Sequence, residues 1–194
     1  MGNRFSAPNK EARLDVSNDA SIVFLDIDGV LNSRVSRENG DHLPDPAMLS
    51  NLKLAMQQVP NCLIVLSSTW RLDSTLARPL RDVLSSEGLS ITDFTPDLEK
   101  LHIGDRVDEI ILWLREHKSE GLPWVAVDDM DLLAMNSKLT AEHFVRTYDG
   151  TGLTPGNADE LRLKLQAQRT LRDSVCTSPE SAARQTGAVT RSRQ

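Results

Sequence analysis

Asp26 and Asp28 are the residues whose type and spacing first suggest chemistry, because they come directly after the apolar run 22–25. Such a run is typical of a strand buried on both faces of a parallel sheet. The alternation of side chains along a strand predicts that both carboxylates point to the same side where the strand ends. Gly29 then allows a sharp turn of the backbone. Open α/β sheets bind ligands at the carboxyl ends of their strands, so we interpret the pair as the beginning of a candidate site.

Two further apolar segments end in short polar clusters, one of hydroxyl groups and one of carboxylates. These residues are Ser67 and Ser68 after residues 62–66, and Asp128, Asp129 and Asp131 after residues 124–127. In a parallel sheet the carboxyl ends of all three strands meet along one edge. The acids gathered there would repel one another strongly without a cation. Oxygen ligands without His or Cys favour a hard ion, and Mg²⁺ held by a few carboxylates and a substrate phosphate is the commonest case.

Carboxylates in this arrangement are suited to reactions at phosphorus. A carboxylate held beside Mg²⁺ can attack phosphorus and form an aspartyl-phosphate. A second carboxylate can protonate the leaving oxygen and later activate a water molecule. The three polar clusters therefore predict a Mg²⁺-dependent reaction of a phosphorylated substrate.

Helices are predicted between the strands, which indicates an α/β fold with a three-layer, Rossmann-like parallel sheet. The residues expected to begin the first three helices are Asp45 with Pro46, Asp73 or Ser74, and Asp105. Two weaker strands are expected over residues 89–94 and 143–147, and a last helix over 157–168 with Glu160 completing a capping box. These elements alternate along the chain as βαβ units do.

The length of 194 residues, 39% of them apolar, is sufficient for one well-buried domain but short for two. We expect a flexible leader over residues 1–20, the domain over 21–168 and a disordered tail over 169–194, because both ends are polar and aperiodic. The formal net charge of −6 argues against stable binding to a nucleic-acid scaffold. It does not argue against a nucleic-acid end as a substrate.

The sequence contains no pattern that predicts export or a membrane span. Cys62 and Cys176 lie far apart and form no metal or disulfide pattern, which suits a reducing compartment, so we expect a cytoplasmic protein. Gly2 and Ser6 match the pattern for N-terminal myristoylation. A single acyl chain gives only marginal membrane binding, and we expect no membrane partner.

Taken in order, these motifs resemble those of the haloacid dehalogenase-like (HAD) hydrolase superfamily over about residues 21–168. Asp26-Ile-Asp28-Gly-Val-Leu is similar to the first motif of that family, which implies Asp26 as the nucleophile and Asp28 as the general acid and base. The resemblance also implies that the hydroxyl of Ser67, with Ser68 beside it, binds the phosphoryl oxygens.

The acidic segment at Asp128 and Asp129 is similar to the last motif of the same family. This resemblance implies Mg²⁺ binding by both residues together with Asp26 and the backbone carbonyl of Asp28. A finer resemblance points to the HAD domain linked to Swiss Army Knife RNA repair proteins. The segments that carry it are Ser67-Ser-x-Trp-Arg71, Asp128-Asp129-x-Asp131, and Thr147 with Gly152-Leu-Thr154.

One departure from the family concerns its third motif, which is normally a lysine near the start of a helix. Arg106 is the best-placed substitute and Lys100 the alternative. An arginine can clamp a phosphoryl group through two hydrogen bonds, whereas the other interpretation makes Arg106 a solvated surface residue. We expect Arg71 to pair with one of the acids at the carboxyl edge of the sheet and Trp70 to lie in the core. We expect Asp131 either to orient a neighbouring ligand or to cap the next helical turn.

Relatives with small substrates usually carry a cap domain, and this chain has no room for one. The gaps over residues 32–45 and 95–104 are far below the roughly 40 residues of an independent domain. We therefore expect an open site that acts on a phosphate of a large molecule, such as a nucleic-acid end or a phosphoprotein. A phosphotransferase and a non-catalytic regulatory module on the same scaffold are the alternatives to a phosphatase.

Overall fold

Five parallel strands form the centre of the structure, a computed structural model that describes residues 14–40 and 42–176. The strands are β1 (Ser21–Leu25), β2 (Cys62–Leu66), β3 (Ile91–Phe94), β4 (Trp124–Asp128) and β5 (Phe144–Arg146). Their order across the sheet is β3-β2-β1-β4-β5, with every pairing parallel. The chain therefore builds outward from β1 in one direction and then in the other. The reversal lies between β1 and β4, the kind of position at which α/β sheets bind ligands.

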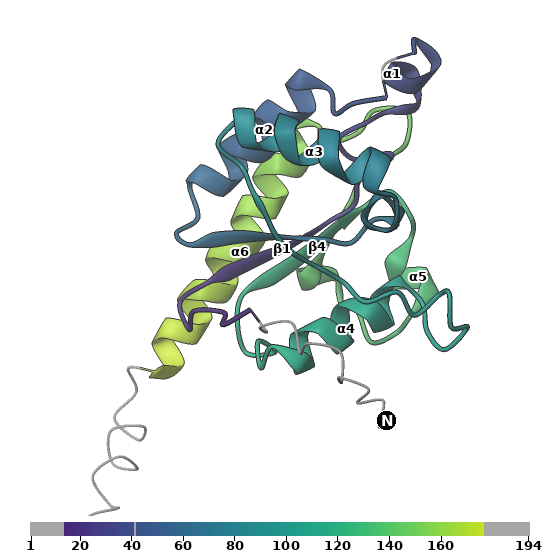
Figure 1. Ribbon diagram of the computed structural model, residues 1–194. Helices are drawn as coiled ribbons and strands as arrows, with labels where there is room; N and C mark the ends of the chain where they lie inside the picture. Colours follow the sequence, from purple (N-terminus) through teal and green to yellow (C-terminus); the bar gives the residue numbers. More distant parts are fainter. Residues whose placement is uncertain (1–13, 41, 177–194) are drawn as a thin grey trace, which may run out of the picture.

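Helices cover both faces of the sheet, which confirms the predicted three-layer α/β fold (Figure 1). The helices are α1 (Arg34–Glu38), α2 (Pro46–Gln57), α3 (Ser74–Ser86), α4 (Arg106–Glu116), α5 (Leu132–Met135) and α6 (Pro155–Cys176), and the 3-10 turns are η1 (Thr69–Leu72) and η2 (Ala141–His143). Helices α2, α3 and α6 pack on one face, and α4 and α5 pack on the other. The side chains of β1 alternate between these two cores, with Val23 and Leu25 on the first and Ile22 and Phe24 on the second.

Aspartates cap the first turns of three helices, as predicted. The carboxylates of Asp45 and Asp73 accept hydrogen bonds from backbone N–H groups in the first turns of α2 and α3. Asp105 and Asp108 exchange side-chain and backbone hydrogen bonds in a capping box at the start of α4. This box determines where α4 begins and so positions Arg106, its first residue.

The last helix begins earlier than predicted. It starts at Pro155, and the backbone N–H of Thr154 donates to the Asn157 side chain at 3.2 Å. The Thr154 hydroxyl in turn accepts from the Asn157 N–H at 3.2 Å. This pair forms the capping box, so the role predicted for Glu160 is wrong. Glu160 instead pairs with Lys164 at 2.6 Å, one turn further along the helix.

The last helix also continues past its predicted end at Gln168 and reaches Cys176, so the first part of the expected tail is helical. Arg169 donates to the backbone oxygen of Asp19 at 2.7 Å, which ties α6 to the segment before β1. The contact is polar and joins distant parts of the chain, so hydrophobic periodicity did not reveal it. The remainder of the expected tail, residues 177–194, lies outside the described residues.

The described part of the expected leader is packed rather than free. Leu14 and Val16 lie against the core on the α4 side of the sheet. Apolar side chains in an otherwise polar segment explain this correction, because their burial against the core is favourable. Residues 1–13, with the myristoylation pattern, lie outside the described residues.

Within the described residues, no cap domain is inserted into the fold. In the described part of the connection from β1 to α2 the one helix is the short α1, which replaces part of the loop predicted over residues 32–45. The backbone N–H of Arg34 at the start of α1 donates to the backbone oxygen of Asp149 at 2.7 Å. No helix in the same part of the chain has both the length and the apolar character needed to cross a bilayer.

Candidate active site

Asp26 and Asp128 lie at the carboxyl ends of the neighbouring strands β1 and β4. The N–H of Asp26 donates to a backbone oxygen of β4 at 3.0 Å, so the pairing of the two strands extends to this residue. The even-numbered residues of both strands belong to the core on the α4 side. The same alternation turns both carboxylates toward α4.

Asp129 completes a cluster of three carboxylates with Asp26 and Asp128, in which one oxygen from each lies within 4.8 Å of the others. A set of carboxylates without His or Cys has the donor chemistry of a hard divalent cation, so these residues fit the predicted metal. The carboxylate of Asp28 is not part of the cluster, and the role implied for its backbone carbonyl stays a prediction. Asp131 caps α5, as predicted, by accepting from a backbone N–H at 3.2 Å.

The acids of the cluster are held in an environment that disfavours full ionisation. Burial raises the pKa of Asp26, although the charge of Arg106 acts in the opposite direction. Burial and then the charge of Asp26 raise the pKa of Asp128 to about 7. Burial also raises the pKa of Asp129. A bound cation would favour the ionised form of all three groups.

Arg106 reaches the cluster from the first turn of α4. Its Nη1 atom lies 2.9 Å from Asp128 and 3.3 Å from Asp26, and it also donates to the backbone oxygen of Ser67. Burial by itself lowers the pKa of Arg106, but the charges of Asp26 and Asp128 outweigh it and raise that pKa. The interpretation of Arg106 as a solvated residue is wrong, because its side chain is buried. Lys100, the alternative, is exposed.

Ser67 and Ser68 follow β2 at the same edge of the sheet. The N–H of Ser67 donates to the backbone oxygen of Leu25 at 2.8 Å, which holds Ser67 beside the residue that precedes Asp26. The Ser67 hydroxyl is buried and has no hydrogen-bond partner among the described residues. A hydrogen bond from the Ser68 side chain lowers the pKa of Asp26, against the larger effect of burial. The unpaired Ser67 hydroxyl is thus a donor available to a bound oxyanion.

Asp28 is not one of the three clustered carboxylates, and it lies beyond the end of β1 at Leu25, so the strand alternation used for the prediction does not extend to it. The indole Nε1 of Trp70 donates to the Asp28 carboxylate at 2.8 Å. Arg37 of α1 approaches the other carboxylate oxygen at 3.6 Å. Trp70 is buried, as predicted. Its hydrogen bond to Asp28 was not predicted. These two partners orient a carboxylate whose side chain remains 46% exposed.

Gly29 makes the turn that follows Asp28, next to the carboxylate of Asp129. Its φ of +73° lies in the left-handed region, and a side chain here would overlap the carboxylate of Asp129. The hydroxyl of Thr147 donates to the backbone oxygen of Gly29 at 2.8 Å. The backbone N–H of Thr147 donates to the backbone oxygen of Asp128 at 3.0 Å. Thr147 therefore connects the turn after β1 to the end of β4.

A buried ion pair between Arg71 and Glu109 lies beside the side chain of Arg106. Its two atoms lie 2.9 Å apart, and the side chains are 5% and 1% exposed. The same Glu109 oxygen is 4.0 Å from Nε of Arg106. Arg71 also donates to the backbone oxygen of Ser68 at 2.7 Å. Arg71 thus forms an ion pair, but the predicted partner, an acid at the carboxyl edge of the sheet, is wrong, because Arg71 pairs with Glu109 of α4. Glu109 was missed, although its place three residues after Arg106 was a usable signal.

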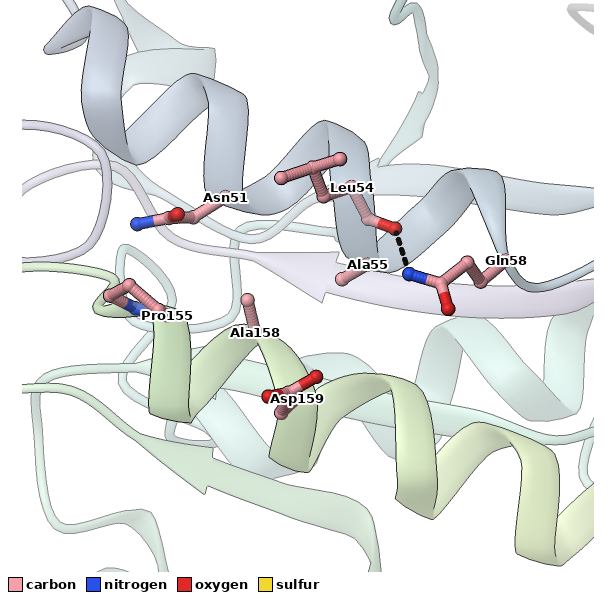
Figure 2. A pocket seen from close by; sticks show the side chains of 7 residues that line it. All are labelled: Asn51, Leu54, Ala55, Gln58, Pro155, Ala158 and Asp159. Atoms are coloured by element: carbon pink, nitrogen blue, oxygen red, sulfur yellow. Dashed lines mark hydrogen bonds between the residues drawn. The ribbon is translucent and has the colours of Figure 1, made fainter.

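A different hollow, of about 190 Å³, lies between α2 and α6 (Figure 2). Asn51, Leu54 and Asp159 are among the residues that line it, and the side chain of Gln58 donates to the Leu54 oxygen at 3.1 Å. None of the predicted site residues contributes to this hollow. Its single carboxylate forms no cluster, so the candidate chemistry stays at the carboxyl edge of the sheet.

One comparison with known proteins covers the segment that carries this site. The model of a family described as the HAD domain in Swiss Army Knife RNA repair proteins matches residues 22–158. No curated protein and no solved structure matches the chain. The matched residues extend from β1 into α6 and include all three carboxylates of the cluster. The chain therefore belongs to the family of HAD domains found in Swiss Army Knife RNA repair proteins.

Proposed function

We propose that this protein is a Mg²⁺-dependent phosphatase that acts through an aspartyl-phosphate on Asp26. The observation that carries the proposal is the position of Arg106 Nη1, 3.3 Å from Asp26 and 2.9 Å from Asp128, beside a cluster of three carboxylates. The arrangement combines an attacking oxygen, a buried positive charge and a set of metal ligands. Membership of the HAD family supports hydrolase chemistry.

Asp26, Asp128 and Asp129 would hold the metal ion. When bound, the ion offsets their negative charge and polarises a phosphoryl oxygen. The raised pKa values of the three acids support this assignment, because the cluster is poorly neutralised by Arg106 alone. The remaining chemistry belongs to the side chains.

Asp26 attacks phosphorus through a carboxylate oxygen, and the P–O bond to the leaving group breaks as the new bond forms. Asp28 gives its proton to the leaving oxygen. It then removes a proton from a water molecule that attacks the phosphoryl group, which breaks the bond to Asp26. Inorganic phosphate leaves, and Asp28 is protonated again. The hydrogen bond from Trp70 holds Asp28 in one orientation for both transfers.

Arg106 and Ser67 are proposed to stabilise the oxygens of the transferred phosphoryl group. Arg106 carries a buried positive charge, and the buried hydroxyl of Ser67 has no partner among the described residues. Donors that are already in position need no reorganisation as charge develops, and each is worth a factor of about 10² to 10³ in rate. Both groups lie at the edge of the sheet where β1 leads into Asp26, and this position supports their proposed roles.

The substrate is proposed to be a phosphate group on a large molecule. In the described part of the chain, α1 is the only helix in the connection that follows β1, and no cap encloses the site. An open edge does not exclude water from a small metabolite, whereas a large substrate brings its own covering surface. Nucleic-acid ends and phosphoproteins are the two classes considered, and the RNA repair context of the family favours the first.

Phosphate release from a panel of substrates tests the proposal. The panel contains an aryl phosphate, free sugar phosphates, mononucleotides, phosphorylated oligonucleotides and phosphopeptides, each with and without Mg²⁺. We expect Mg²⁺-dependent release from the aryl phosphate and a higher kcat/KM for one of the large classes. Transfer to an added alcohol in preference to water would indicate a phosphotransferase. Binding without turnover of any substrate would contradict the proposal and indicate a non-catalytic module.

A further inference from the structure

A hollow of about 400 Å³ opens between α3, η1 and the end of β3. Its walls include Arg71, Arg78 and Arg81 together with Leu72 and Phe94, and none of its lining residues, all of which are described, is acidic. The chain as a whole has a formal net charge of −6. The three arginines are therefore a local concentration of positive charge on an acidic protein.

Two of the three arginines are available to a ligand. Arg71 is used internally, since it donates to three backbone oxygens and pairs with Glu109. Arg78 and Arg81, both exposed on α3, form no ion pair with any residue in 14–40 or 42–176. The guanidinium carbon of Arg81 lies 5.0 Å from the centroid of the Phe94 ring. This cation–π contact holds the planar guanidinium against the ring, and its N–H groups remain free to donate.

The hollow is lined by the last residue of β3, two strands away from β1 in the sheet. Phe94, the last residue of β3, pairs with Leu66 of β2, and β2 is the neighbour of β1. Adjacent strands are about 4.8 Å apart, so the end of β3 lies about 10 Å from the end of β1. The turn η1 joins the two places, because its Trp70 contacts the site at Asp28 and its Leu72 lines the hollow. A polymer whose terminal group enters the site would lay its next units across this hollow.

We propose that the hollow binds a single-stranded nucleic acid beside the terminal phosphate that Asp26 attacks. Arg78 and Arg81 contact phosphates of the strand backbone, and a base stacks on the pair formed by Arg81 and Phe94. This inference rests on the proposed phosphatase function and adds a binding surface to it.

The chemistry of the hollow favours a nucleic acid over a phosphopeptide. A single strand carries a phosphate on every unit, so two unpaired guanidinium groups outside the catalytic cluster both find a partner. A singly phosphorylated peptide presents its one phosphate to the cluster and leaves Arg78 and Arg81 without one. Aromatic and guanidinium planes beside positive charge are also the usual means of binding single strands, because every base offers a face for stacking.

Fluorescence anisotropy with a labelled oligonucleotide tests the inference. The probe is a single strand of about ten nucleotides with a terminal phosphate, a length typical of such sites. Asp26→Asn protein prevents turnover, and Arg78→Gln and Arg81→Gln are added to it together. The matched control adds Arg115→Gln and Lys118→Gln, which remove the same charge from exposed residues at the far end of α4. Melting temperatures verify that each variant is folded.

We expect the Arg78 and Arg81 substitutions to weaken binding at least tenfold and the control substitutions to leave it unchanged. The plot of log affinity against log salt should also flatten by about 1.4, since each lost phosphate contact on a single strand removes about 0.7. Binding equal to that of Asp26→Asn alone would overturn the inference. The inference would also be overturned if a labelled phosphopeptide bound as tightly as the oligonucleotide and if the same substitutions weakened its binding by as large a factor.

The two proposals fail in different ways. Absence of aryl phosphate hydrolysis by the wild-type protein would contradict the phosphatase proposal. The strand-binding surface would still be supported if the oligonucleotide bound through Arg78 and Arg81. Conversely, if the enzyme is active but oligonucleotide binding is unchanged by substitution of both arginines, the phosphatase proposal stands and the proposed binding surface is rejected.

Discussion

Arg106 holds Asp128 through a buried hydrogen bond of 2.9 Å that comes from a single nitrogen, Nη1. The same atom makes the contacts with Asp26 and with the Ser67 oxygen. A lysine offers one nitrogen with three donors, so one ammonium group has enough donors for all of these partners. This observation supports the proposal that Arg106 takes the role of the lysine found in the third motif of HAD hydrolases.

We therefore predict that Arg106→Lys keeps kcat/KM within about tenfold of the wild-type value, the equivalent of roughly 1.4 kcal/mol. Arg106→Met should abolish activity and lower the melting temperature, because it leaves two buried carboxylates without a positive partner, a loss worth about 3–5 kcal/mol. Steady-state kinetics and thermal unfolding measure the two effects. Full activity of Arg106→Met would rule out a role for the guanidinium in the reaction.

A second prediction concerns the indole of Trp70 and its hydrogen bond to Asp28. Asp28→Asn should slow turnover by about 10²- to 10⁴-fold, the usual worth of a positioned acid or base. Trp70→Phe should lower kcat by about 10- to 100-fold with little change in KM, because a hydrogen bond to a charged group is worth about 1.5–3 kcal/mol. The double variant should be no slower than Asp28→Asn alone. A further drop in the double variant would show that Trp70 does not act through Asp28.

The third prediction concerns the metal. Adding Mg²⁺ should raise the melting temperature of the wild-type protein, because a ligand that binds only the folded state stabilises it. Asp129→Ala should largely remove this response and raise the melting temperature of the metal-free protein, since repulsion within the cluster decreases. Asp82→Ala, which removes an exposed acid from α3, is the control. The same Mg²⁺ response in Asp129→Ala and the control would exclude Asp129 as a ligand.

The raised pKa of Asp128 predicts how the stability of the metal-free protein depends on pH. In the folded protein this carboxyl titrates at about 7, above its ordinary value of 3.8. The folded state therefore binds more protons than the unfolded chain between these values, so stability falls as pH rises through this range. Melting temperatures in a chelator should decrease from about pH 5 to about pH 7.5, and Asp128→Asn should flatten the decrease. An equally steep decrease in Asp128→Asn would contradict this origin.

Local sequence signals were sufficient for the framework of the fold. The apolar residues of β1, β2 and β4 and the aspartates at 45, 73 and 105 depend on neighbours in the sequence, and the structure has each of them where it was expected. The convergence of Asp26, Ser67 and Asp128 on one edge followed from a single rule about parallel sheets.

Partners that come from distant segments were not predictable in the same way. The indole of Trp70 meets Asp28 across 42 positions, and Glu109 meets Arg71 across 38. Arg169 reaches Asp19 across 150 positions, from the part of α6 that lies beyond its predicted end. These contacts join polar groups, which leave no periodic pattern in the sequence. Two of these contacts also determine details of the site. The hydrogen bond from Trp70 orients Asp28, and the ion pair between Arg71 and Glu109 lies beside Arg106.

The proposed mechanism depends most on the transfer of the phosphoryl group to Asp26. Acid quenching of the protein during turnover of an aryl phosphate with Mg²⁺, followed by peptide mass spectrometry, tests it most directly. We expect a single acid-stable phosphoryl group on the peptide that contains Asp26, lost on treatment with hydroxylamine and absent from Asp26→Asn protein. Mg²⁺-dependent phosphate release by Asp26→Asn at the wild-type rate, with no such adduct on the wild-type protein, would contradict it.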